Sequence, residues 1–231
     1  MAKNHRLQEL LALEHPPVGV AFLDKRPLAL ARMTATAPSG CTFWQRAAEG
    51  AAFYTEATDH FGCPVGAHTH NVDLPPAKHE ELAGLVQTMV GLSYLTTDEV
   101  ARLPRRKREF RFAAYYPLTA ADLPTDLEPE VVLVRGGARQ LMLLNETLMA
   151  LGLESKSGAL GRPTCGMIPD VIESGLGALS LGCIGNRVYT GLGDNEAYMA
   201  LPGAALAQIT ERLATIVAAN HSLAEFHAAR R

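Results

Sequence analysis

The sequence lacks any long hydrophobic run and any excess of one charge. Its 231 residues carry 21 Lys and Arg against 24 Asp and Glu, for a formal net charge of −3. Nucleic-acid-binding domains usually carry a basic surface, and a membrane span needs about 20 consecutive apolar residues. Residues 1–13 mix polar and apolar side chains and have no apolar signal-peptide core. The composition therefore predicts a cytoplasmic protein whose partners include neither nucleic acid nor a membrane.

Cysteine is scarce, and its four copies form no common short metal-binding motif. Cys41, Cys63, Cys165 and Cys183 contain no C-x-x-C and none of the ferredoxin spacings. The reducing cytoplasm argues against structural disulfides. The four residues are therefore interpreted as metal ligands, catalytic thiols or buried apolar residues.

The four cysteines occur instead as two pairs with similar neighbouring sequence. Cys41 and Cys165 each begin a predicted helix, whereas Cys63 and Cys183 each follow a glycine at the end of a segment. A helix of about nine residues advances roughly 13 Å, and a return strand of about five residues covers roughly 17 Å. Both cysteines of a pair can therefore lie at the same end of such a unit. The argument is weaker for the first pair, because residues 53–60 do not resemble a strand.

This arrangement suits thiolate ligands. A helix N-terminus carries partial positive charge and free N–H groups, which lower the pKa of a thiol. If both pairs share one end of the domain, four thiolates converge, as an iron–sulfur cluster such as 4Fe–4S or a structural zinc requires. The sequence thus predicts a metal-centre protein for electron transfer, redox sensing or a small redox reaction. Two alternatives are an enzyme that uses an activated Cys165 and a zinc-stabilised binding module.

Four arginines are candidate cofactor-binding residues. Arg135 and Arg139 flank a Gly-Gly turn between a predicted strand and helix, where backbone N–H groups can hold a small anion. The turn lacks the Lys-Ser/Thr of a P-loop and is not G-x-G-x-x-G, so a tight turn with surface arginines is the alternative. Arg162 and Arg187 lie near cysteines and could offset the charge of a thiolate-bound cluster.

Three histidines bracket Cys63, in a segment, residues 60–76, that is predicted to be a loop. His60 could join Cys63 in a mixed metal site. His68 and His70 would point apart in an extended loop and do not form an obvious chelating pair. The alternative is that all three are polar loop residues.

The segments around the cysteines and the Gly-Gly turn resemble a known family. These strings are CTFWQRAAEG, HFGCPVGAHTHN, VVLVRGGARQLMLLNE, GRPTCGMIPDVIESG and LSLGCIGNRVYTGLGDNEAYMALPG. They resemble the uncharacterised ArCR family of archaea and bacteria, a domain of unknown function, over roughly residues 16–201. The resemblance implies a cysteine-containing protein with metal binding, and it assigns neither an activity nor a catalytic residue.

The predicted strands occur in local runs, which favours an α+β fold over a doubly wound sheet. Residues 1–231 are predicted to form a single domain with a mixed or antiparallel sheet, a core at 16–201 and a long helix at 203–229. Residues 186–189 are among the predicted strands. One stripe of the terminal helix includes polar residues that are awkward to bury in a monomer, which predicts a homodimer, with a redox partner as a further possibility. The stripe is Leu206, Ile209, Leu213, Ile216, Asn220, Leu223 and His227.

Overall fold

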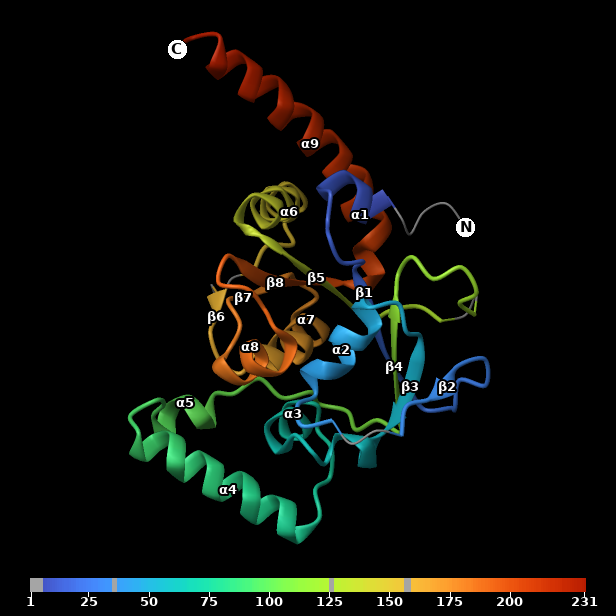
Figure 1. Cartoon of the computed structure of the whole chain (residues 1–231), viewed down its shortest axis with the longest axis vertical. Helices are drawn as coiled ribbons and strands as arrows, with labels where there is room; N and C mark the ends of the chain where they lie inside the picture. Colours follow the sequence, from blue (N-terminus) through green and yellow to red (C-terminus); the bar gives the residue numbers. More distant parts are fainter. Residues whose placement is uncertain (1–5, 35–36, 125–126, 156–158) are drawn as a thin grey trace.

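The computed structural model describes residues 6–34, 37–124, 127–155 and 159–231, and within them eight strands form one continuous mixed sheet (Figure 1). The strands are β1 (Val18–Leu23), β2 (Ala31–Arg32), β3 (Phe53–Glu56), β4 (Phe112–Pro117), β5 (Val131–Gly137), β6 (Ala159–Leu160), β7 (Ala178–Ser180) and β8 (Glu196–Pro202). Their order in the sheet is β2-β3-β4-β1-β5-β8-β7-β6. The predicted α+β class and single sheet-containing domain are confirmed.

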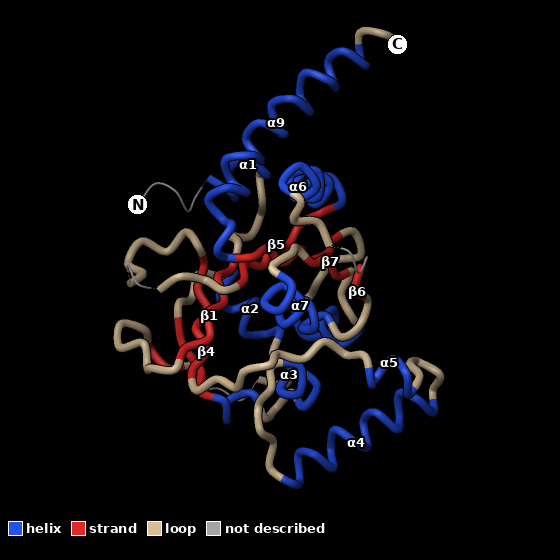
Figure 2. The backbone as a smooth tube through the Cα atoms, turned by 180° about the vertical axis from the view of Figure 1, so that it is seen from behind, coloured by secondary structure: helices blue, strands red, loops and turns tan. Residues whose placement is uncertain are grey.

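Helices cover both faces of this sheet (Figures 1 and 2). They are α1 (Arg6–Leu11), α2 (Cys41–Ala48), α3 (Pro64–Thr69), α4 (Pro76–Gly91), α5 (Thr97–Ala101), α6 (Ala138–Leu151), α7 (Met167–Ser174), α8 (Ile184–Thr190) and α9 (Leu206–Ala228), with short 3-10 turns η1 (Ala57–His60), η2 (Thr164–Gly166) and η3 (Gly203–Ala205). One face carries α1, α6 and α9, and the other carries α2, α3, α7 and α8. Helices α4 and α5 extend beyond the second layer.

Strand β4 illustrates how the central strands divide the interior into two cores. Ala113 and Tyr115 point to the side of α2 and α7, whereas Ala114 and Tyr116 point to the side of α6 and α9. Because both faces are covered, the strand is an almost continuous apolar run rather than an alternation of polar and apolar residues. The core on the α2 side also contains the buried cysteines Cys41 and Cys165.

The sheet has an approximate internal twofold symmetry. Counted outward from the centre, residues 18–117 contribute β1, β4, β3 and β2, and residues 131–202 contribute β5, β8, β7 and β6. Going outward from the centre, the first two pairs of neighbouring strands are antiparallel and the third pair is parallel, and this holds in both halves. The two central strands, β1 and β5, are themselves antiparallel. This pattern places a twofold axis perpendicular to the sheet between β1 and β5, and it makes α2 equivalent to α7.

Two local predictions were wrong. The segment 60–76 is not all loop, because α3 forms within it, and residues 186–189 form part of helix α8 rather than a strand. In α8 the Cys183 side chain caps the helix N-terminus and Gly191 ends the helix in the left-handed region, with φ +62°. These two features of the helix ends outweigh the preference of Val188 and Tyr189 for β-strands.

The terminal helix packs mainly through its first half, against α6 and α1. Ile209 and Leu213 are buried there, whereas residues 221–231 are exposed and project away from the body (Figures 1 and 2). Asn220 donates a hydrogen bond to Glu146 of α6 at 3.1 Å, so this polar residue has a partner within its own chain. None of the helices in the described part of the chain combines the length and apolar character that crossing a membrane requires.

Candidate thiol site

Cys63 and Cys183 occupy the same position in their two halves, at the N-terminus of a short helix. The Gly66 N–H donates to Cys63 Sγ at 3.4 Å, and the Asn186 N–H donates to Cys183 Sγ at 3.5 Å. A Cβ atom at Gly66 would lie 3.1 Å from that sulfur, so glycine permits the close approach. The two cysteines therefore begin helices α3 and α8, and this position corrects the prediction that they only end the preceding segments.

Cys41 and Cys165 are the buried members of each pair. Cys41 is the first residue of α2, and Cys165 lies in η2 immediately before α7, as predicted from the sequence. The Thr69 hydroxyl, which comes from the other half, lies 3.3 Å from Cys165 Sγ. Thr164 Oγ1 accepts a hydrogen bond from the Cys183 N–H at 2.6 Å and thereby connects the two cysteines of the second pair.

The predicted helix-and-return-strand unit is present in both pairs. After Cys41 the chain forms α2 and returns as β3, and after Cys165 it forms α7 and returns as β7. The doubtful segment 53–60 is a strand followed by the turn η1. Contacts between the halves follow the twofold symmetry, because α2 contacts α8 and α3 contacts η2. Each contact brings the element that carries the first cysteine of one half against the helix capped by the second cysteine of the other.

The four thiols interact electrostatically. Burial raises the pKa of Cys41 to about 12; Asn186 acts in the opposite direction, and charge at Cys63 and Cys183 raises the pKa further. Burial also raises the pKa of Cys165 well above its usual range, with additional contributions from the other three thiols. At Cys41 and Cys165 the expected lowering at a helix start is therefore outweighed by burial and by repulsion from the other thiols, so these two thiols stay protonated unless a cation compensates.

The side chains do not form a ready-made site for one metal ion. Among the described residues, no group of three or more His, Cys, Asp or Glu side chains could hold a metal ion as it stands. A mononuclear zinc site places its sulfurs about 2.3 Å from one centre. The four cysteines thus share a region without meeting at a single point.

Two buried polar side chains that were not among the predicted residues face the thiols. Charge at Cys41 and Cys165 contributes, after burial, to the raised pKa of Tyr115. The Tyr115 hydroxyl and both polar atoms of the Asn186 carboxamide have no hydrogen-bond partner among the described residues. Tyr115 lies in a strand remote in sequence from any cysteine, so no local signal marked it. Asn186 stands three residues after Cys183, the position of Gly66 relative to Cys63, and that parallel could have identified it.

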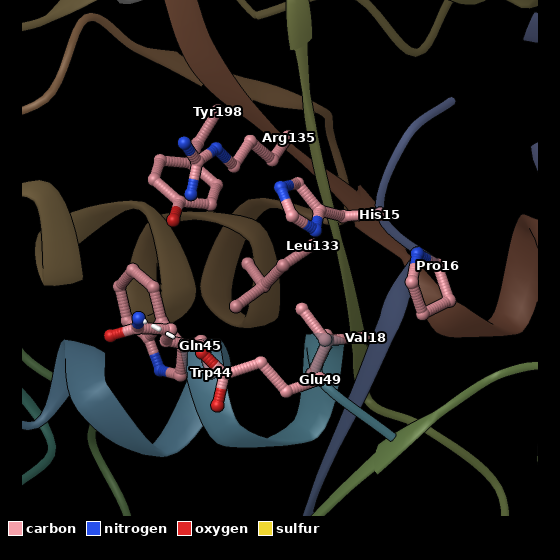
Figure 3. Close-up of a pocket in the computed structure, with 10 residues that line it drawn as sticks. His15, Pro16, Val18, Trp44, Gln45, Glu49, Leu133, Arg135 and Tyr198 are labelled. Atoms are coloured by element: carbon pink, nitrogen blue, oxygen red, sulfur yellow. Dashed lines mark hydrogen bonds between the residues drawn. The ribbon is translucent and has the colours of Figure 1, made fainter. Parts of the chain in front are cut away.

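Arg135 and Arg139 do not lie with the cysteines. Arg135 donates to both oxygens of Glu196, from Nε at 2.9 Å and from Nη2 at 2.5 Å, and Arg139 is exposed. The Gly137 N–H, which was expected to be available to an anion, donates to Gln140 Oε1 at 2.7 Å. Arg135 lines a cavity of about 50 Å³ with His15, Trp44 and Tyr198 (Figure 3), which holds no more than a few waters. Arg135 and the Gly137 N–H are thus engaged within the protein.

The other two arginines also have protein partners. Arg162 forms an ion pair with Glu99 at 3.0 Å and stacks on the ring of Tyr94. Arg187 donates to backbone carbonyls on both sides of α8, to Leu181 O at 2.6 Å before the helix and to Gly193 O at 2.9 Å after it. Arg187 therefore links the two segments that flank the Cys183 helix.

His60 and His70 are buried core residues rather than polar loop residues. Their rings meet edge to face at 6.0 Å, and His60 Nε2 lies 2.9 Å from Thr55 Oγ1. Burial lowers the pKa of His60 to about 4; burial, then the charges of His60 and Arg106, lower that of His70 to about 3. His68 is half-buried, and its pKa is lowered by burial and then by nearby positive charge. Both buried rings are neutral at physiological pH.

Comparison with known proteins gives one match. No curated protein and no solved structure matches the chain. One family of uncharacterised proteins has a sequence profile that spans residues 6–212, which includes all four cysteines and both symmetric halves of the sheet. The chain therefore belongs to the uncharacterised ArCR family.

Proposed function

We propose that Cys41, Cys63, Cys165 and Cys183 bind one iron–sulfur cluster, of the 4Fe–4S type, in a reducing cytoplasm. The observation that carries the proposal is the convergence of four thiols, two from each half, on one region of the fold. Such a centre would serve electron transfer to or from a redox partner, redox sensing or a small redox reaction.

The residues present fit such a group chemically. Four sulfurs match the usual ligand set of a cluster, and two backbone N–H groups already point at Cys63 and Cys183. The iron ions would supply the positive charge that the buried thiols need in order to ionise. Glycine at position 66 leaves room beside one sulfur. When bound, the cluster would supply one-electron chemistry, while the chain's own residues hold it and exclude water.

A cluster and a single zinc ion make different demands on the positions of the four sulfurs. A tetrahedral zinc site draws all four sulfurs to about 2.3 Å from one atom, whereas a polynuclear cluster spreads its ligands over several metal atoms. A nucleophilic Cys165 is less favoured, because burial and neighbouring thiols oppose formation of its thiolate.

Metal analysis tests the proposal directly. Protein purified without oxygen should be brown and contain about four irons per chain with acid-labile sulfide. Stoichiometric zinc in colourless protein would replace the cluster with a structural zinc site. A protein that holds neither iron, sulfide nor zinc would contradict any metal centre at these cysteines.

We also propose that the free end of α9 pairs with a second copy of the chain. Leu223 and Phe226 are 56% and 53% exposed on the projecting turns of the helix. Light scattering should give the mass of a dimer for the whole chain and of a monomer for a chain ending at Ala219. Equal masses for the two chains, or a monomer at all concentrations, would contradict the dimer.

A further inference from the structure

Several buried polar side chains on the thiol side of the sheet lack a hydrogen-bond partner among the described residues, and they include Trp44, Tyr115 and Asn186. Tyr115 is fully buried, its ring stacks on Phe43 at 5.5 Å, and its hydroxyl has no partner. The carboxamide of Asn186 is also buried and forms no well-aligned hydrogen bond, although it approaches the Cys41 thiol closely enough to lower the pKa of that thiol through hydrogen bonding. Buried polar groups are almost always hydrogen-bonded, because an unpaired one carries its full desolvation penalty. Both groups therefore indicate a ligand with acceptor atoms.

Their surroundings locate that ligand. Phe43, which stacks on Tyr115, lies two residues after Cys41 in α2, and Tyr115 is electrostatically coupled to Cys41 and Cys165. Asn186 lies one turn after Cys183 in α8, which packs against α2, and its side chain influences the Cys41 thiol. The two donors therefore approach the cysteines from the sheet and from α8.

We propose that the Tyr115 hydroxyl and the Asn186 carboxamide donate hydrogen bonds to the sulfur atoms of the group bound by the four cysteines, and thereby set its reduction potential. This inference rests on the proposed cluster. One-electron reduction adds negative charge to the cluster, and donors directed at its sulfurs stabilise the reduced form more than the oxidised form. Both side chains are thus ligand-contacting residues rather than core filling.

Twofold symmetry supports a specific role for Asn186. The residue equivalent to Asn186 in the first half is Gly66, three residues after Cys63, and it has no side chain to donate. The backbone N–H at both positions already serves the cysteine that caps the helix. The Asn186 side chain is therefore an addition to the shared scaffold, made on only one side of the site.

A redox titration of the cluster-loaded full-length chain tests the proposal. Tyr115→Phe and Asn186→Leu should each lower the midpoint potential by about 59 mV. At a fixed potential, this shift lowers the ratio of reduced to oxidised cluster about tenfold for a one-electron couple. Tyr116→Phe is the matched control, because that neighbouring hydroxyl lies on the opposite face of the sheet, 3.4 Å from Leu127 O. Its potential should equal that of the wild type.

The outcomes separate this inference from the proposed function. A wild-type chain with neither iron nor sulfide overturns both. A loaded chain whose potential is the same in Tyr115→Phe, Asn186→Leu and Tyr116→Phe overturns only the role of the two donors. A second measurement uses thermal unfolding: Tyr115→Phe should stabilise the metal-free chain, where the hydroxyl is unpaired, and destabilise the loaded chain. Shifts in the same direction in both forms would overturn the proposal.

Discussion

The two halves of the molecule share a scaffold but differ in what surrounds their cysteines. Each half has a buried cysteine at the start of a helix and a half-buried cysteine that caps a second helix. Helix α6 is an addition in the second half, and α4 and α5 are additions in the first. The buried histidines belong only to the first half, and the buried asparagine Asn186 only to the second. The symmetric part therefore positions four sulfurs, and the asymmetric part determines their environment.

The largest expected effect comes from the cysteines. Changing either buried cysteine, Cys41→Ser or Cys165→Ser, should abolish metal binding, because each replacement leaves an open position on a buried group. The two variants should behave alike if the halves are equivalent. Iron and sulfide analysis after anaerobic purification measures the effect.

Cys63→Ser and Cys183→Ser extend the same comparison to the half-buried positions, and both should lose or destabilise the centre. If the double variant of Cys41 and Cys63 keeps the wild-type metal content, the site does not involve both halves. A centre built from Cys165, Cys183 and other ligands would then be the better account.

The buried histidines should make stability depend on pH. The pKa of His60 is lowered to about 4 and that of His70 to about 3, so the unfolded chain binds protons below pH 6.5 that the folded chain does not. The contribution of the two neutral histidines to the free energy of unfolding is present above pH 6.5 and is lost as the pH falls toward 4. The free energy of unfolding should therefore decrease between pH 7.5 and 5 by about 2 kcal/mol per histidine. Urea unfolding at these pH values measures the change.

A variant at one of these positions separates the two contributions. His70→Phe should reduce the pH dependence by roughly half and should also remove two ring nitrogens that have no partner among the described residues. The control is His227→Gln on the exposed end of α9, which should keep the wild-type pH dependence. An unchanged pH dependence in His70→Phe would contradict a buried neutral histidine at this position.

The smallest expected effect concerns two glycines near the capping cysteines. Gly66→Ala should destabilise the protein by about 1 kcal/mol, because the added Cβ would lie 3.1 Å from Cys63 Sγ. Gly185→Ala, in the corresponding helix of the other half, meets no atom within 4 Å and should stabilise the protein by about 0.5–1 kcal/mol. Thermal unfolding of both variants tests the difference in sign. A stabilising Gly66→Ala would mean that the sulfur can move aside.

Much of the local structure was predictable from the sequence. Helix α2 begins at Cys41 as predicted, because a helix-start signal is encoded by adjacent residues. Helices α3 and α8 were missed because their capping group is a cysteine, which is not among the usual capping residues. The candidate thiols were recognisable from their similar sequence settings. Arg135 and Arg139 were predicted on a different basis, as residues beside a turn that could bind a small anion.

By itself, the sequence determined the α+β class, the two similar cysteine settings and the helix-and-return-strand unit in each half, because these features depend on residues close together in the chain. Only the tertiary structure decided that the two units face each other across a twofold axis, since pairing of β1 with β5 joins segments more than 100 residues apart. Other contacts between distant segments pack Tyr115 of β4 against Phe43 of α2. His60 and His70, which were expected in a loop, are likewise buried in the core. Burial, which no local pattern records, then reversed the expected pKa shifts of Cys41 and Cys165.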